Sequence, residues 1–162
     1  TPSTILAAKA AAIFLSRQDN PVDVTATQFV GGATGQAIQE HLTDLGILQI
    51  SGLTEATTRK TVTLIDYQKG GEIPTVTELI SPSGTITQKE IDCLYGDLVA
   101  AAPAFGAILL MGTWPTGVTR DFYAGLAAAK GEGSFVLMDA FSPPDDILSI
   151  LSEGHVDILK AP

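Results

Sequence analysis

Residues 107–139, AILLMGTWPTGVTRDFYAGLAAAKGEGSFVLMD, contain the pattern that decides the fold. The apolar run 107–111 has the length and composition of a buried strand, and a turn rich in glycine and proline follows it at once. An amphipathic stretch then runs from Thr119, a residue type that caps helices, to Lys130. A second apolar run, 135–139, completes the unit. Strand, helix and strand in this order predict a βαβ crossover with parallel strands.

The same alternation extends to both sides of this stretch. A strand pattern at 24–30 breaks at the glycine-rich segment 31–35, and apolar residues then recur at helical spacing until Gly46. Towards the C-terminus, two prolines open a further helix before a last strand. We therefore predict an α/β fold with a mostly parallel sheet and helices on both faces. Its strands are expected near 24–30, 107–111, 135–139 and 156–159.

The segments 61–66 and 75–80 are rich in β-branched residues and read as strands. The turn signal Gly70-Gly71 lies between them. The sequence therefore predicts a β-hairpin over 61–80.

Two more helices are predicted beside these strands. Thr87 and Glu90 have the spacing of a capping box ahead of an apolar stripe, which predicts a helix to about Ala102. The apolar segment 5–15 carries Lys9 and is too short to cross a bilayer, so it reads as a buried helix.

Composition excludes several classes of function. Eighteen acidic residues against nine basic ones give a net charge of −9, which disfavours binding to nucleic acid. The single cysteine, Cys93, excludes an internal disulfide framework, and His41 and His155 lack the spacing of metal ligands. We expect a cytoplasmic protein with no zinc site and no membrane partner.

Loops at the carboxyl ends of the parallel strands are the places where chemistry is expected. They are the segments 31–35 and 112–117 and the surroundings of Asp139. The glycines of 31–35 permit close approach of a ligand to the backbone, but they match neither the dinucleotide fingerprint nor the phosphate-binding loop. A glycine-rich turn with a purely geometric role is the alternative.

Four segments together resemble the PfkB, or ribokinase-like, carbohydrate kinases. GTWPTGVTRDFYAGLAAAKGEGSFVLMD (112–139) is similar to their G-S-L-P-x-G-V…D-F-Y…G…V-x-L-D run. The other matches are FVGGATGQAIQEHLTDLGI (29–47), TTRKTVTLID (57–66) and TELISPSGTIT (77–87). In order and spacing they fit the phosphosugar branch, which contains 1-phosphofructokinases, minor 6-phosphofructokinases and tagatose-6-phosphate kinases. The resemblance implies a ribokinase-like three-layer sandwich with a mostly parallel central sheet and a small β-hairpin lid.

The resemblance also implies a set of substrate-binding residues. Arg59 would contact the phosphate of a phosphosugar, a task that suits a permanently charged bidentate donor, although an exposed arginine at a strand end is an equal alternative. Gly112 and Thr113 would line the sugar pocket, while Pro115 and Gly117 shape the loop. Implied substrate contacts are Arg59, Gly112, Thr113, Lys9, Gly31 and Gly32.

Two departures from the family pattern limit the functional prediction. Only Lys9 remains of a G-G-K-G-x-N-x-A segment, since alanines stand at 7, 8 and 12. The sequence ends at Pro162, ahead of the family's N-x-x-E motif and its G-x-G-D loop with the catalytic aspartate. We therefore predict no catalytic residue and no metal ligand in this chain, and a site for ATP and Mg²⁺ that lies mostly outside it.

Two functions remain open. The first is the substrate-side portion of a PfkB-type kinase that transfers the ATP γ-phosphate to a sugar or phosphosugar, not competent by itself. The second is a noncatalytic sugar-kinase-like binding or structural protein. In either case we expect one incomplete ribokinase-like domain over 1–162, with the hairpin 61–80 as a lid that also pairs subunits in a homodimer.

Overall fold

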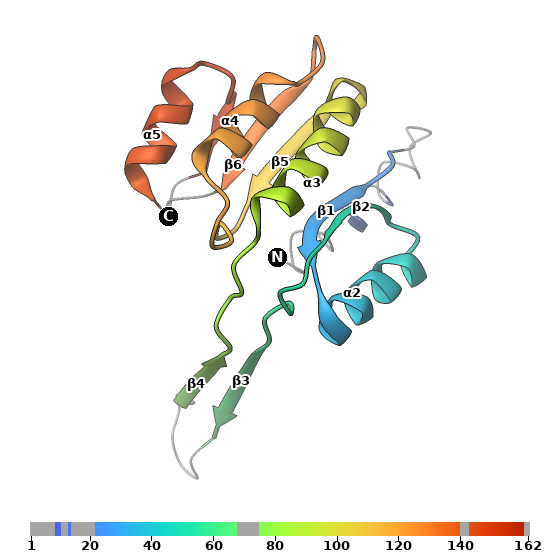
Figure 1. Ribbon diagram of the computed structural model, residues 1–162, viewed down its shortest axis with the longest axis vertical. Helices are drawn as coiled ribbons and strands as arrows, with labels where there is room; N and C mark the ends of the chain where they lie inside the picture. Colours follow the sequence, from blue (N-terminus) through green and yellow to red (C-terminus); the bar gives the residue numbers. More distant parts are fainter. Residues whose placement is uncertain (1–8, 11–12, 14–21, 68–74, 140–142, 161–162) are drawn as a thin grey trace.

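The computed structural model describes residues 9–10, 13, 22–67, 75–139 and 143–160 (Figure 1). The predicted turn at Gly70-Gly71 lies outside these ranges. The elements follow the chain in the order β1 (Thr25–Val30), α2 (Gly32–Asp44), β2 (Leu48–Leu53), β3 (Thr61–Asp66), β4 (Thr75–Ile80), α3 (Gln88–Ala101), the 3₁₀ turn η1 (Ala102–Ala104), β5 (Ala107–Met111), α4 (Arg120–Ala128), β6 (Phe135–Asp139), α5 (Pro144–Ser152) and β7 (Ile158–Leu159).

The first βαβ unit consists of β1, α2 and β2. β1 and β2 are parallel, in a register that pairs Thr25 with Leu48 and Val30 with Leu53. α2 begins at Gly32, inside the segment that the sequence analysis read as a break. β2 was not predicted: the alternation of apolar and polar residues in LQISGL covers only its first four residues and ends at Gly52.

The second unit confirms the prediction from residues 107–139. β5 pairs with β6 in parallel, from Ala107 opposite Phe135 to Met111 opposite Asp139, and β6 pairs with β7 in parallel. α4 ends at Ala128, slightly before the expected end, and β7 has two of the four predicted residues. Parallel strands connected by helices are therefore the basis of the fold.

Helices lie on both faces of the β1–β2 pair. On one face Ala26 packs with Leu42 of α2 and with Ile47. On the other face, Phe29 and Ile50 pack against a core cluster with members from α3, α4, α5, β5 and β6. In this part of the fold, α2, the β1–β2 pair and α3 therefore form three layers. The buried residues of this larger cluster are Ile86, Ile91, Leu94, Leu98, Leu110, Val118, Phe122, Ala124, Leu126, Ala127, Val136, Met138, Ile147 and Ile150.

Among the described strands, hydrogen bonds form two separate parallel sheets, β1-β2 and β5-β6-β7. α3 connects them through its side chains. A Cβ at Gly52 of β2 would lie 2.9 Å from Cδ1 of Phe29 and 3.1 Å from Cβ of Leu94, so β2 and α3 pack closely at this glycine. The rings of Phe29 in β1 and Phe122 in α4 lie 5.9 Å apart. The continuous core therefore fixes the two sheets relative to each other.

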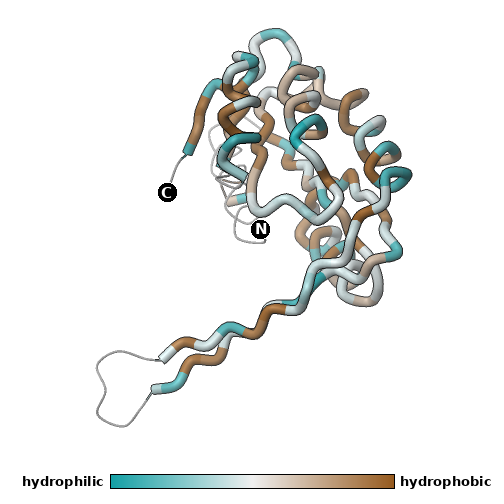
Figure 2. Tube along the Cα trace, turned by 60° about the vertical axis from the view of Figure 1, so that its left-hand side comes forward, coloured by the Kyte–Doolittle hydropathy of each residue, from teal (hydrophilic) through white to brown (hydrophobic). Residues whose placement is uncertain are grey.

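β3 and β4 form an antiparallel pair that projects from the body of the protein (Figures 1 and 2). At its base, the Lys60 N–H donates to Ser81 Oγ (2.7 Å) and the Ser81 N–H donates to the Lys60 carbonyl (2.9 Å). Every described residue of both strands is exposed. The predicted strands are thus present, while the role of the hairpin as a lid stays a prediction.

Candidate functional site

The carboxyl ends of β1 and β5 point to the same edge of the molecule, from which the hairpin projects (Figure 1). Gly31 follows β1, Thr54 follows β2 and Gly112 follows β5. In α/β folds this edge is where ligands bind, because the connecting loops and helix N-termini meet there. Five of the six predicted substrate residues lie in or beside these loops.

Gly31 is held tightly by the segment after β2. Its N–H donates to Thr58 Oγ1 (2.9 Å), and its carbonyl accepts from the Thr58 N–H (3.0 Å). A Cβ at this position would lie 2.1 Å from the Ala56 carbonyl oxygen. Only glycine allows the two backbones to come this close. The first glycine of the G-G-x-x-G segment therefore has a structural reason in this fold.

The N-terminus of α2 lies directly beside this contact. Gly31 is its N-cap and no side chain caps the helix, so the N–H groups of the first turn lack the usual side-chain acceptor. Gly32 has φ +62°, a left-handed conformation that glycine adopts without strain. A helix N-terminus of this kind favours the binding of an anion.

Arg59 lies between two fastened residues. Thr58 is bonded to Gly31, and Lys60 is bonded to Ser81 at the base of the hairpin. The Arg59 side chain itself is exposed, and none of the ion pairs among the described residues includes it. Its backbone is thus fixed while its guanidinium group is available for an acidic ligand.

The loop after β5 contacts the segment after β4. The Ile86 N–H donates to the Thr116 carbonyl (2.8 Å), and a Cβ at Gly117 would lie 2.3 Å from the Ile86 carbonyl oxygen. Gly84 in turn lies against Ala56, since a Cβ there would be 2.4 Å from the Ala56 Cβ. These contacts join the loops after β2, β4 and β5 into one layer.

Trp114 anchors the turn after β5. Its ring stacks on that of Tyr123 in α4, with centroids 4.4 Å apart and an interplanar angle of 16°. Burial raises the pKa of the Tyr123 phenol well above its usual range, so this group stays neutral. The turn is therefore held by the aromatic stack on α4 and by the hydrogen bond from Ile86 to Thr116.

Gly112 and Thr113 lie at the open part of this turn. The Gly112 N–H donates to the Asp139 carbonyl (3.2 Å) at the end of β6, and open space surrounds the position of its missing Cβ. Thr113 is exposed. The Asp139 carboxylate binds Lys160 Nζ at 2.7 Å, so it has a structural partner.

Lys9 does not join the other predicted residues. Its Nζ donates to the Gly46 carbonyl (3.4 Å), in the turn between α2 and β2. This turn precedes β2 and so lies at the amino end of the strands, opposite Gly31 and Gly112. The structure therefore places Gly31, Gly32, Arg59, Gly112 and Thr113 in loops at the carboxyl edge of the strands, and leaves Lys9 at the opposite edge.

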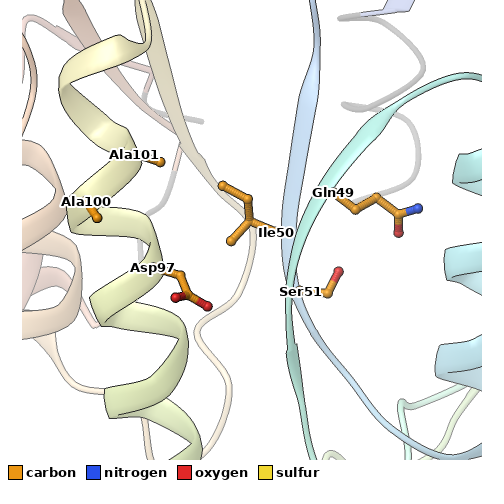
Figure 3. A pocket seen from close by; sticks show the side chains of 6 residues that line it. All are labelled: Gln49, Ile50, Ser51, Asp97, Ala100 and Ala101. Atoms are coloured by element: carbon orange, nitrogen blue, oxygen red, sulfur yellow. The ribbon is translucent and has the colours of Figure 1, made fainter.

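A pocket of about 590 Å³ lies elsewhere, between β2 and α3 (Figure 3). It contains none of the predicted substrate residues. Ile50 points toward α3, whereas the side chains of Gln49 and Ser51 point to the other side of β2, toward α2, where Gln49 Nε2 donates to the Gln39 carbonyl (3.0 Å). Gln49 Oε1 and Ser51 Oγ are buried without a hydrogen-bond partner among the described residues. The lining residues are Gln49, Ile50, Ser51, Asp97, Ala100 and Ala101.

The described ranges hold neither a candidate metal cluster nor a candidate membrane span. No group of three or more histidine, cysteine, aspartate or glutamate side chains there could hold a metal ion. No helix in those ranges is long and apolar enough to span a membrane.

Sequence similarity links the chain to sugar-phosphate kinases. No protein-family model matches it. Over 119 residues, 73% of this chain and 36% of the relative, it is 28% identical to a tagatose-6-phosphate kinase of Staphylococcus epidermidis strain RP62A. The corresponding protein of strain ATCC 12228 is 27% identical over the same length. The chain thus spans little more than a third of these curated relatives.

Solved structures agree with this similarity. A protein described as a possible 1-phosphofructokinase from Thermotoga maritima superposes with a TM-score of 0.69 at 23% identity, covering 89% of this chain and 43% of that one. Phosphofructokinase-2 from Escherichia coli, in its tetrameric inhibited form, superposes with a TM-score of 0.66 at 20% identity, covering 85% of this chain and 43% of that one. The chain has the fold of the PfkB-type sugar kinases. The resemblance drawn from the sequence is therefore confirmed, and the role of each site residue in this PfkB-type fold stays a prediction.

Two residues beside the candidate site were not recognised from the sequence. Thr58 was not singled out, and its partner Gly31 is 27 positions away. Glu90 was recognised only as part of a capping box, although its carboxylate also accepts from the Glu55 N–H, 35 positions away. Neither contact leaves a local signal, because local patterns report only on neighbours along the chain.

Proposed function

We propose that this chain is the substrate-side portion of a PfkB-type kinase that transfers the ATP γ-phosphate to a hydroxyl group of a phosphosugar. One observation carries the proposal. In a PfkB-type fold, the loops that hold Gly31, Arg59 and Gly112 meet at the carboxyl edge of the parallel strands. The names of the relatives, tagatose-6-phosphate kinase and phosphofructokinase, support a phosphosugar as the acceptor.

In this proposal Arg59 binds the phosphate of the phosphosugar. Its exposed guanidinium offers several N–H donors in a planar fork, which suits a phosphate group. The uncapped start of α2 at Gly32 adds a favourable field for the same anion. Gly112 and Thr113 contribute backbone and hydroxyl contacts to the sugar.

We propose the hairpin as a lid that also pairs two subunits. Its register places Val62 and Leu64 with Leu79 on one face, and Ile65 with Val76 and Ile80 on the other. These side chains are each about half exposed. A two-stranded hairpin with apolar residues on both faces is marginally stable in water. One apolar face would be covered by closing over the sugar, and the other by contact with a second copy of the chain.

The proposal treats residues 1–162 as one incomplete ribokinase-like domain, consistent with coverage of 36% of the curated relatives. ATP and Mg²⁺ are expected only from the chemistry of the PfkB-type kinases, and we assign no residue of this chain to either. The exposed, unpaired Cys93 fits a reducing compartment such as the cytoplasm.

A noncatalytic sugar-kinase-like binding protein is the second candidate. The position of Lys9 favours it, since the Nζ atom binds Gly46 at the amino edge of the strands instead of the proposed sugar site. Alanines at 7, 8 and 12 also lack side-chain hydrogen bonds for a sugar hydroxyl.

Calorimetry and a phosphorylation assay test both candidates. The chain is titrated with tagatose 6-phosphate, fructose 6-phosphate and fructose 1-phosphate, and with tagatose and fructose as controls. Preferential binding of a phosphosugar supports the proposed site, whereas equal or absent binding of all five overturns it. The product of the whole gene is then assayed with MgATP. Binding without phosphorylation selects the noncatalytic candidate.

A further inference from the structure

The carboxylate of Glu90 joins two segments that are far apart in the sequence. Its Oε2 accepts from the Thr87 N–H and the Thr87 hydroxyl, both at 2.7 Å. Its Oε1 accepts from the Glu55 N–H, also at 2.7 Å. The Glu90 N–H donates back to Thr87 Oγ1 (3.4 Å), which completes the capping box. A capping box needs only one of the two oxygens, so the second is free for Glu55.

The two joined segments are the connections at the base of the hairpin. Glu55 lies in the connection from β2 to β3, and Thr87 lies in the connection from β4 to α3. Arg59 follows Glu55 by four residues in the first connection. The contact between Ala56 and Gly84 brings the two connections together as well. The bond to Glu55 therefore adds a third attachment to the connection that carries Arg59, beside those of Thr58 to Gly31 and Lys60 to Ser81.

We propose that Glu90 is a positioning residue for Arg59: its carboxylate fixes the segment 54–60 to the N-terminus of α3 and so sets the place of the guanidinium group. This inference rests on the proposed phosphosugar site. Preorganisation of this kind saves the ligand the entropic cost of ordering the segment on binding. Thr58 holds the same segment to Gly31, so Glu90 and Thr58 fix it from two sides.

The ionised form of Glu90 is the one that makes these contacts. Hydrogen bonds from the backbone and hydroxyl of Thr87 and from the backbone of Glu55 lower the pKa of its carboxyl group. Both oxygens are therefore acceptors at neutral pH.

Two variants separate positioning from helix capping. Glu90→Gln keeps one carbonyl oxygen for the capping box, in which glutamine is an accepted residue, but its amide nitrogen cannot accept from Glu55. Thr87→Ala is the matched control. It removes the hydroxyl of the cap and leaves Oε1 of Glu90 for the Glu55 N–H. Both variants weaken the start of α3, and only Glu90→Gln weakens the bond to Glu55, while Thr54, Thr58 and Lys60 keep their bonds to Val30, Gly31 and Ser81.

The first measurement is amide hydrogen exchange in the whole chain without ligand. In Glu90→Gln we expect the Glu55 amide to exchange about tenfold faster than in the unmodified protein, because its bond to the Glu90 side chain is weakened. In Thr87→Ala the increase is confined to the first turn of α3. Unchanged exchange at Glu55 in Glu90→Gln, or the same increase at Glu55 in both variants, overturns the proposal.

The second measurement is calorimetry with tagatose 6-phosphate and with tagatose. Glu90→Gln should weaken binding of the phosphosugar roughly five- to tenfold and change binding of tagatose less than about twofold. In an Arg59→Ala background the same substitution should have no further effect, since Glu90 acts through Arg59. Additive losses contradict this. If the unmodified chain binds no phosphosugar, the proposed function fails, and the exchange experiment alone decides whether Glu90 holds the segment.

Discussion

Gly31 and Thr58 exchange two hydrogen bonds: the Gly31 N–H donates to the Thr58 hydroxyl, and the Thr58 N–H donates to the Gly31 carbonyl. This reciprocal pair fastens the start of α2 to the segment that leads into the hairpin. It connects the glycine loop to the residue directly before Arg59.

Thr58→Val should destabilise the protein by about 1–2 kcal/mol, because the half-buried Gly31 N–H loses its acceptor. Thr58→Ser keeps the hydroxyl and should cost clearly less. Urea denaturation followed by circular dichroism measures both. Equal stability of the valine variant and the unmodified protein would show that this hydrogen bond contributes nothing net.

Gly117→Ala should be more destabilising than Gly133→Ala. Both glycines have positive φ, +98° and +79°, so a side chain adds strain of roughly 1–2 kcal/mol at either position. At Gly117 the added Cβ also meets the Ile86 carbonyl oxygen, whereas open space surrounds Gly133. Thermal unfolding of the two variants isolates the contact with Ile86, and identical melting temperatures would refute it.

Arg59→Ala should weaken binding of a phosphosugar roughly ten- to a hundredfold, the loss expected for a charge-assisted contact of about 1.5–3 kcal/mol. Arg59→Lys should restore only part of the affinity, because lysine lacks the planar fork. Calorimetry with the unphosphorylated sugar is the control. A loss of affinity of the same size for both ligands would show that Arg59 does not bind the phosphate.

Asp157 should stabilise the fold in a pH-dependent way. Its carboxylate accepts from Lys130 Nζ (2.6 Å) and from the Val136 N–H (2.7 Å), and these bonds lower its pKa below the usual 3.8. For a lowered carboxyl pKa, the contribution to stability is complete above the unfolded-state value and is lost as the pH falls through the folded-state value. Asp157→Asn should therefore be less stable than the unmodified protein near neutral pH.

The stability difference caused by Asp157→Asn should shrink as the pH falls below about 3.8. Asp121→Asn is the matched control, since the Asp121 side chain is 85% exposed and its ion pair with Arg120 contributes little. Urea unfolding at a series of pH values measures both differences. A difference for Asp157→Asn that stays constant down to acidic pH would contradict the prediction.

The sequence by itself determined the elements whose patterns are local. The apolar runs 107–111 and 135–139 are strands, and the capping box of Thr87 and Glu90 starts α3, with both of its hydrogen bonds formed. Such signals are readable because burial and helix capping act between residues close in sequence. The resemblance to PfkB-type kinases, confirmed by the fold, rested on the same ordered segments.

Only the tertiary structure decided how the loops meet. The sequence of β2 did not predict a strand. Its position between helices on two faces appears only in the tertiary structure. Lys9 kept the residue type of a family motif, yet its Nζ lies at Gly46, away from the other predicted residues. The bonds from Gly31 to Thr58 and from Glu55 to Glu90 span 27 and 35 positions. Contacts over such separations form only when the packing of the core has fixed the strands and helices that carry them.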